Sequence, residues 1–337
     1  MASPRLVNMT TSIAVLAAKE VEQLLLESPD SVIDCVRRAY QQHHRGNTVV
    51  PHSTFLRFPT DDSPNRIIGL PAYLGADGDQ PSHAGMKWIA SFPGNIDHGL
   101  PRASAAILLN STRTGQPVAL LEGASISAHR TAASAALAAK ALSAPGPVGL
   151  SLIGCGVINL AVFRYVHRLL PSIRRVLLHD VDRERAADLA RRLPATVDIE
   201  IAESLDVALR RETLISFATN AGTPYTSLAG CQPGSVVLGV SLRDLTADAL
   251  LAARNVVDDI DHVDRERTSI HLATTQVGHR DFVEASIGEL LDGAVEWRRD
   301  DQVTVVSPFG LGVLDIALAS WVLDRAQSAG SYTAVPW

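Results

Sequence analysis

The sequence has few cysteines, no excess of positive charge and no long hydrophobic run. Its three cysteines, Cys35, Cys155 and Cys231, are odd in number and far apart, so we expect neither a disulfide framework nor a metal site. Lys and Arg number 30 against 36 Asp and Glu, which argues against nucleic acid as a partner. The apolar run near the N-terminus is short and broken by polar residues, so it predicts neither a signal peptide nor a membrane span. We therefore expect a cytoplasmic protein without a membrane partner.

The composition is that of an ordinary globular protein, with 46% hydrophobic and 20% charged residues in a chain of 337. This length predicts two domains, at about 100–200 residues each. Apolar residues recur at roughly helical spacing between residues 11 and 45, with a break at Ser28-Pro29-Asp30. Short β-like runs separated by Gly and Pro fill residues 49–119 and predict a mainly antiparallel or mixed sheet. An alanine-rich helix is expected over residues 125–144.

A different pattern begins at Val148, where short apolar runs alternate with segments of helical spacing. VGLSLIG and RRVLLHD are typical of buried strands, and NLAVFRYVHRLL and RERAADLARRL are typical of helices. Strands that alternate with helices indicate βαβ units and a parallel sheet, because parallel strands need a crossover connection. We therefore expect an α/β fold, in which a Rossmann-type doubly wound parallel sheet follows an α+β domain.

The sharpest motif joins the first of these strands to the first helix through Gly154-Cys155-Gly156-Val157-Ile158-Asn159. The first glycine permits a tight turn, the second lets the backbone approach a pyrophosphate, and the helix start offers N–H groups to that anion. Asn159 stands where a third small residue is usual. Asp180 ends the second strand, where a carboxylate binds the ribose hydroxyls and repels a 2′-phosphate, so NAD is predicted over NADP. The alternative is a glycine turn that binds no nucleotide, with Asp180 a solvated acid.

A second set of candidate site residues consists of cations that precede the glycine motif in the sequence. Each lies among apolar residues or at the end of an expected strand: Arg57, Arg66, Lys87, Arg102 and Arg130. A cation in such a place is costly unless it pairs with an acid or meets an anionic ligand. For each arginine, a structural ion pair or a surface position is the competing interpretation. Lys87 lies between Met86 and Trp88 in a strand-like run, and Arg130 lies near the start of the alanine-rich helix, where a dipole favours anions over cations. These two residues are the better candidates for a ligand site.

The residues carry a family resemblance from about Val49 to Ala319. The segments FLRFP, NRIIGLPAYLG, GMKWIASFPGNIDHGLPRAS and TGQPVALLEGASISAHRTAASAA resemble the ornithine cyclodeaminase/μ-crystallin superfamily. More narrowly, they resemble the dehydrogenases that make 2,3-diaminopropionate in siderophore and antibiotic pathways. ISFATNAGTPY, GVSLRDL, DDIDHVDRERTSIHLA and VSPFGLGVLDIALA agree with that narrower group.

The resemblance implies a reaction and a set of site residues. Enzymes of the narrower group use NAD to oxidise N-(2-amino-2-carboxyethyl)-L-glutamate, and hydrolysis of the imine releases 2,3-diaminopropionate and 2-oxoglutarate. Lys87 and Asp244 match the family's catalytic lysine and aspartate, and Arg57, Arg66 and Arg130 are expected to bind the small anionic substrate. An N-cap for the helix that starts near Thr246 is the ordinary interpretation of Asp244. The cofactor is assigned to Gly154, Gly156, Val157, Ile158, Asp180, Thr131 and Thr219.

The resemblance also implies an architecture. A substrate and dimerisation domain is expected over residues 1–128 together with 316–337, and an NAD domain over 129–315, in a homodimer that pairs through the first sheet. Two other functions stay open: ornithine cyclodeamination, which releases ammonia with no net redox change, and ligand binding without turnover, as in a μ-crystallin-like protein. Arg243 disfavours a cationic diamine substrate, because it places positive charge near the site. The roles of the histidines are also open: His52, His83, His129 and His262.

Overall fold

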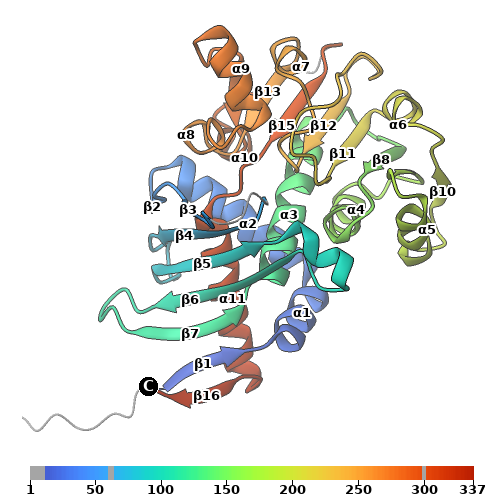
Figure 1. Ribbon diagram of the computed structural model, residues 1–337. Coiled ribbons are helices and arrows are strands. Elements are labelled where there is room, and N and C mark those ends of the chain that lie inside the picture. The colour runs from blue at the N-terminus through green and yellow to red at the C-terminus, as the bar shows by residue number, and fades with distance from the viewer. Residues whose placement is uncertain (1–11, 60–63, 298–300) are drawn as a thin grey trace, which may run out of the picture.

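The chain forms two eight-stranded sheets (Figure 1). Most strands of the first precede residue 148, and all strands of the second follow it. The computed structural model describes residues 12–59, 64–297 and 301–337. The first sheet has the strand order β16-β1-β7-β6-β5-β4-β2, with β3 also paired to β4. The second has the order β10-β9-β8-β11-β12-β15-β13-β14. The first eleven residues of the N-terminal segment discussed above lie outside the described residues.

The first sheet is mixed, as the alternation of short apolar runs predicts. Its strands are β1 (Ser12–Leu16), β2 (Thr48–Val49), β3 (Thr54–Arg57), β4 (Arg66–Leu74), β5 (His83–Ser91), β6 (Ala103–Asn110), β7 (Pro117–Glu122) and β16 (Thr333–Pro336). All pairs are antiparallel except β1 with β7, which run parallel. A 3-10 helix, η1 (Pro93–His98), lies between β5 and β6.

The prediction of helix from residue 11 onward is wrong at its start. Residues Ser12–Leu16 form a strand, and the helices begin only with α1 (Ala18–Glu27) and α2 (Pro29–His44). The segment SIAVL is apolar, and its backbone hydrogen-bonds to β7 on one side and β16 on the other. Helical spacing in a short apolar run cannot be told from a buried strand, and here pairing with distant strands decides. The break at Pro29 is confirmed, because Pro29 is the first residue of α2.

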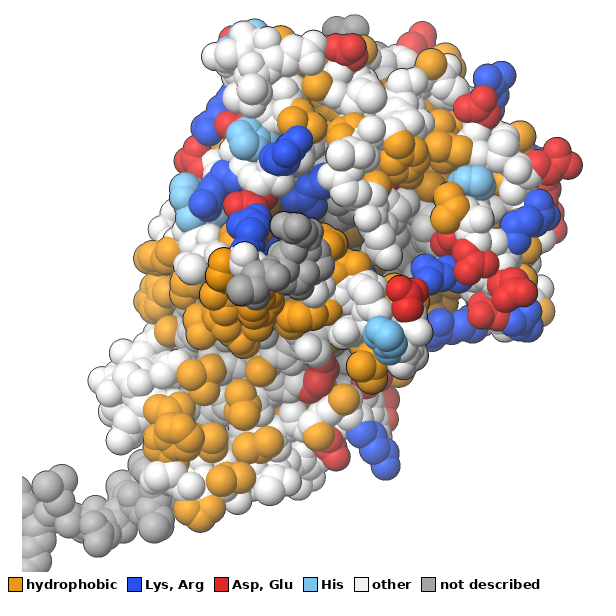
Figure 2. Space-filling model, viewed as in Figure 1, with side chains coloured by type: hydrophobic (Ala, Val, Ile, Leu, Met, Phe, Trp, Pro, Cys, Tyr) orange, Lys and Arg blue, Asp and Glu red, His pale blue; other side chains and the backbone are white. Residues whose placement is uncertain are grey.

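Helices cover one face of the first sheet and leave the other exposed. The C-terminal helix α11 (Gly312–Ala329) packs against β4, β5 and β6, and α3 (Ala124–Leu142) packs against α2 and α11 (Figure 1). On the opposite face, hydrophobic side chains gather over the strands (Figure 2). Neighbouring strands there place apolar residues opposite one another, in the row Pro71, Met86, Leu108 and Leu120.

The second sheet is parallel throughout and confirms the predicted α/β fold class. Its strands are β8 (Gly149–Ile153), β9 (Arg175–His179), β10 (Asp198–Ile201), β11 (Leu214–Phe217), β12 (Val236–Gly239), β13 (Arg254–Val257), β14 (Val283–Ser286) and β15 (Thr304–Ser307). Its helices are α4 (Val157–Leu169), α5 (Arg183–Arg192), α6 (Leu205–Arg211), α7 (Ala247–Leu251), α8 (Ile260–Val263), α9 (Ser269–Val277) and α10 (Ile287–Asp292). The chain runs outward from β8 first to β9 and β10 and then, on the other side, to β11 and β12, with β15 inserted between β12 and β13. It therefore reverses beside β8, where doubly wound sheets bind ligands.

Helix α3 connects the two sheets, and it packs most extensively against α4 of the second one. Helix α11 follows the last strand of the second sheet and returns to the first (Figure 1). The boundaries at residues 128 and 315 stay a prediction. Helix α3, which spans the first boundary, contacts β6 of the first sheet and β12 and β15 of the second. In the described part of the chain, no helix combines the length and hydropathy needed to cross a membrane.

Candidate active site

Lys87 lies in an otherwise apolar row of the first sheet. It pairs with Leu70 of β4 and Ile107 of β6, and its side chain faces the covering helices with 1% of the residue exposed. Its ammonium group donates to Asp315 of α11 at 2.6 Å and to Ser127 of α3 at 3.1 Å. A buried ammonium is costly without such partners, so the helices that cover the sheet also neutralise it.

Two cations share the single carboxylate of Asp315. Arg130 of α3 donates from Nε to the second oxygen of Asp315 at 3.1 Å, and it also reaches Ser127 at 3.4 Å. Asp315 is fully buried and supplies one negative charge to two cations. The three side chains therefore carry a net positive charge when Lys87 is protonated. Burial, aided by the charge of Arg130 and opposed by Asp315, lowers the pKa of Lys87 to about 8. The arrangement can hold an anion and can exchange a proton near neutral pH.

Asp244 is buried and held by three hydroxyl groups. Thr219 donates to one carboxylate oxygen at 2.5 Å and Tyr225 to the same oxygen at 3.2 Å, while Ser241 donates to the other. The N-cap interpretation of Asp244 is wrong, because Thr246 caps α7 itself by accepting from the Ala249 N–H. The carboxylate is therefore free of a capping role and is fixed in direction by its donors.

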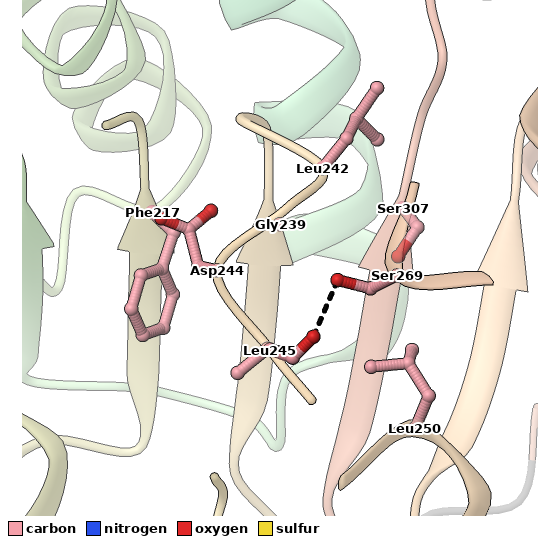
Figure 3. A pocket seen from close by; sticks show the side chains of 8 residues that line it. All are labelled: Phe217, Gly239, Leu242, Asp244, Leu245, Leu250, Ser269 and Ser307. Atoms are coloured by element: carbon pink, nitrogen blue, oxygen red, sulfur yellow. Dashed lines mark hydrogen bonds between the residues drawn. The ribbon is translucent and has the colours of Figure 1, made fainter. Parts of the chain in front are cut away.

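Asp244 opens onto a small pocket at the carboxyl ends of the parallel strands (Figure 3). Figure 3 shows its carboxylate beside the ends of the strands that carry Phe217 and Gly239. Ser307 lines the same pocket, and the segment that follows it brings Gly310 against the guanidinium of Arg130. Asp258 fixes this segment by accepting from the N–H groups of Phe309 and Gly310, at 2.9 and 2.6 Å. A single short loop thus links the pocket of Asp244 to the Lys87 group.

The glycine motif forms the turn that the sequence predicts. Gly154 has φ of +86°, and a Cβ there would lie 2.4 Å from the carbonyl oxygen of Ala218. Gly156 precedes α4, and a Cβ on it would meet open space. Asn159, in place of a third glycine, is fully buried and donates to the carbonyls of Ile153 and Gly154, at 2.9 and 2.8 Å. The asparagine therefore hydrogen-bonds the start of α4 to the end of β8 and to the turn, whereas a small residue at this position could make only packing contacts.

Asp180 turns back toward the glycine motif. It accepts from the Cys155 N–H at 2.7 Å and the Asp182 N–H at 3.0 Å, and so stands directly after β9 at the mouth of the turn. Two hydrophobic residues beside it are unusually exposed, Val157 at 67% and Val181 at 99%. These features fit the parts of a dinucleotide. The open glycine turn suits the pyrophosphate, the fixed carboxylate suits a ribose, and the exposed aliphatic side chains suit a base. Ile158 is half-buried in α4, and the cofactor roles of Thr131 and Thr219 stay predictions.

The predicted substrate arginines divide into two groups. Arg130 joins Lys87, as described, whereas Arg57 and Arg66 lie at the edge of the first sheet that faces Arg243. Arg57 has 59% of its side chain exposed and pairs with Glu266 at 2.5 Å. Three of the four histidines have structural partners among the described residues. His129 contacts Tyr165 at 2.7 Å, His262 contacts the carbonyl of Val50 at 3.1 Å, and the His52 ring packs edge-on against the His262 ring.

Asp315, Ser127 and Glu266 are the residues that sequence reasoning missed. Asp315 was visible in principle, as the one acid in the apolar run VLDIALA, where a charge needs a partner. Ser127 and Glu266 carry no comparable signal, because each acts through a contact with a residue far away in the sequence.

The parallel sheet, its glycine turn and the acid after the second strand define a dinucleotide-binding protein, whose first sheet carries a buried lysine. The chain belongs to the ornithine cyclodeaminase/mu-crystallin family, which it matches over residues 11–330. The family resemblance of the sequence is thereby confirmed.

Relatives within the family support this assignment. The chain is 27% identical to an N-((2S)-2-amino-2-carboxyethyl)-L-glutamate dehydrogenase of Staphylococcus aureus, over 95% of this chain and 97% of that protein. The structure resembles Thermococcus litoralis Delta(1)-pyrroline-2-carboxylate reductase in complex with NADH and L-proline, with a TM-score of 0.87, 25% identity and coverage of 96% and 100%. It also resembles an archaeal alanine dehydrogenase dimer with bound NAD, with a TM-score of 0.86, 25% identity and coverage of 96% and 99%.

The two glycines of the turn provide a matched pair of variants. Gly154→Ala should lower the free energy of unfolding by about 1–3 kcal/mol, because alanine disfavours the left-handed conformation and its methyl group meets a carbonyl oxygen. Gly156→Ala should leave stability nearly unchanged but weaken NAD binding, because the methyl group stands where the pyrophosphate approaches. Denaturant unfolding and an NAD titration measure both effects. Wild-type stability in the first variant, or wild-type NAD affinity in the second, would contradict this description of the turn.

Proposed function

We propose that the protein is an NAD-dependent dehydrogenase that cleaves N-(2-amino-2-carboxyethyl)-L-glutamate to 2,3-diaminopropionate and 2-oxoglutarate, for siderophore or antibiotic biosynthesis. The enzyme class and cofactor agree with the dehydrogenase and NAD-bound relatives in the family. The substrate is the one named for the Staphylococcus aureus relative. In the balanced reaction, the substrate, NAD and water give the two products, NADH and a proton.

The observation that carries the proposal is the surplus of positive charge around the site. Once Lys87 has taken the proton of the substrate amine, it shares one carboxylate with Arg130, and the two cations have charge left for a substrate carboxylate. Further arginines lie around Arg66, at the edge of the first sheet. A substrate with three carboxylates matches this surplus, whereas an amino acid with one carboxylate uses only part of it.

NAD supplies the hydride acceptor for oxidation at the glutamyl α-carbon. The amine must be neutral for that step, and Lys87, whose pKa burial lowers to about 8, can accept its proton. Arg130 keeps its charge and holds the substrate carboxylate beside it. Hydrolysis of the substrate imine needs a directed water molecule, and the Asp244 carboxylate, fixed by Thr219, Tyr225 and Ser241, can orient and deprotonate it. The proton on Lys87 can then return to the departing amine.

Ornithine cyclodeamination would use the same cofactor on a substrate with a second cationic amine. The arginines around Arg66 disfavour it, because an ammonium group would meet like charge there. Binding without turnover would leave the fixed direction of Asp244 and the lowered pKa of Lys87 without a use.

We further propose that the protein is a homodimer that pairs through the exposed face of its first sheet. This face carries the apolar row that includes Met86 and Leu120, which are 36% and 38% exposed. A continuous apolar surface over several strands is typical of a subunit interface. The archaeal alanine dehydrogenase relative is a dimer.

Turnover of candidate substrates tests the reaction. With the aminocarboxyethyl-glutamate and NAD, we expect NADH, 2-oxoglutarate and 2,3-diaminopropionate in equal amounts, with the products identified by mass. Ornithine serves as the matched substrate, since cyclodeamination gives proline and ammonia but no net NADH. Proline from ornithine, with no NADH from the tricarboxylate, would establish the cyclodeaminase instead. No product from either substrate would favour a ligand-binding protein.

Lys87 and Asp244 are expected to act in the chemistry rather than only in binding. Lys87→Met and Asp244→Asn should fold and bind NAD, yet lose at least about a hundredfold in kcat, the scale of lost general acid–base help. Steady-state kinetics, an NAD titration and a melting curve of each variant separate the two roles. A near-normal kcat would remove that residue from the mechanism, and early melting with loss of NAD would show that its role is structural.

A further inference from the structure

Arginines accumulate at one edge of the first sheet, beside the second domain. Arg57 of β3 lies directly opposite Arg66 of β4, and Arg66 lies opposite Ser91 of β5. Arg102, just before β6, donates to the Ser91 hydroxyl at 3.1 Å. Like charges that face each other across antiparallel strands destabilise the pairing. In the part of the sheet that the structure describes, no ion pair within the sheet offsets this electrostatic cost.

The second domain adds to the same positive charge. Arg243, next to Asp244, is half-buried and close enough to Arg66 to lower its pKa, after the larger effect of burial. Burial also lowers the pKa of Arg102 and of Arg243. Guanidinium groups keep their charge in proteins despite such shifts, so the cluster stays positive. We call this set the arginine cluster: Arg57, Arg66, Arg102 and Arg243.

A single carboxylate meets the cluster from within the described residues, that of Glu266. Its side chain pairs with Arg57 at 2.5 Å, and its backbone carbonyl accepts from Arg243 at 2.7 Å. Glu266 and its neighbour Arg267 both have φ of +56°, a conformation that residues with a Cβ seldom adopt. A strained segment thus presents one carboxylate that pairs with Arg57 and acts on the charges of Arg66 and Arg243, and the contact crosses from the second sheet's half of the chain to the first.

We propose that the arginine cluster is a second carboxylate subsite, and that Glu266 occupies it until a substrate carboxylate displaces the side chain from Arg57. This inference rests on the proposed function, which supplies a substrate with carboxylates at both ends. Lys87 and Arg130 would hold the carboxylate at the reacting carbon, and the cluster would hold a remote one. The cluster would then select polycarboxylates over amino acids with a single carboxylate.

The test uses the NAD-bound protein with two probes: the aminocarboxyethyl-glutamate in kinetics, and citrate, a tricarboxylate, in calorimetry. Arg243→Gln should raise the KM for the substrate and the Kd for citrate about tenfold or more, the scale of one charge-assisted hydrogen bond. Glu266→Gln should lower both about threefold or more, because an internal competitor is removed. The control is Arg113→Gln, an exposed arginine between β6 and β7, which should change neither.

Each outcome decides a separate point. Unchanged binding in Arg243→Gln would overturn the subsite, and weaker binding in Glu266→Gln would show that Glu266 organises the arginines rather than competing with the ligand. Melting curves identify a variant that fails to fold, in which case Arg102→Gln replaces it with the same expectation as Arg243→Gln. If citrate binding responds as expected but the aminocarboxyethyl-glutamate is not oxidised, the subsite stands and the proposed function fails.

Discussion

The buried carboxylate of Asp315 is the interaction on which the site depends. It joins Lys87 of the first sheet to Arg130 of the connecting helix, and it lies on the helix that returns after the parallel sheet is complete. Three elements far apart in the sequence are thereby fixed around one charge. Buried ion pairs contribute little net stability, because desolvation offsets their attraction. Here the pair with Asp315 keeps an ammonium group in an apolar row and raises its pKa, while burial brings that pKa down to about 8.

The two halves of the site use opposite means to control charge. Around Lys87, burial lowers the pKa of the ammonium group, and the shared Asp315 carboxylate raises that pKa in part. Around Asp244, three hydroxyl donors fix a carboxylate in direction. The loop from Ser307 to Gly310 contacts both groups, so their relative position depends on the Asp258 carboxylate that holds the loop. One group suits proton exchange with an amine, and the other suits the direction of a water molecule.

The predictions that succeeded rest on local pattern. The parallel sheet, the turn at Gly154 and the place of Asp180 follow from the spacing of residues within about thirty positions. The predictions that failed needed distant partners. Residues Ser12–Leu16 become a strand because β7 and β16 pair with them. Asp244 is no helix cap because Thr246 caps α7, and the Asp244 carboxylate instead accepts from the hydroxyls of Thr219 and Tyr225. Likewise, Asp315 pairs with a lysine 228 positions away, and no local pattern reports such a contact.

The pH dependence of kcat/KM for substrate oxidation, measured for the wild type and for Asp315→Asn, tests this account most directly. Lys87 must lose its proton before it can accept one from the amine, so the wild-type value should rise with pH through about 8. The Asp315 carboxylate raises the pKa of Lys87 against the effect of burial, so removing its charge should move the rise to lower pH. A rise at the same pH in both proteins would show that another group titrates, and it would contradict the role assigned to the Lys87–Asp315 pair.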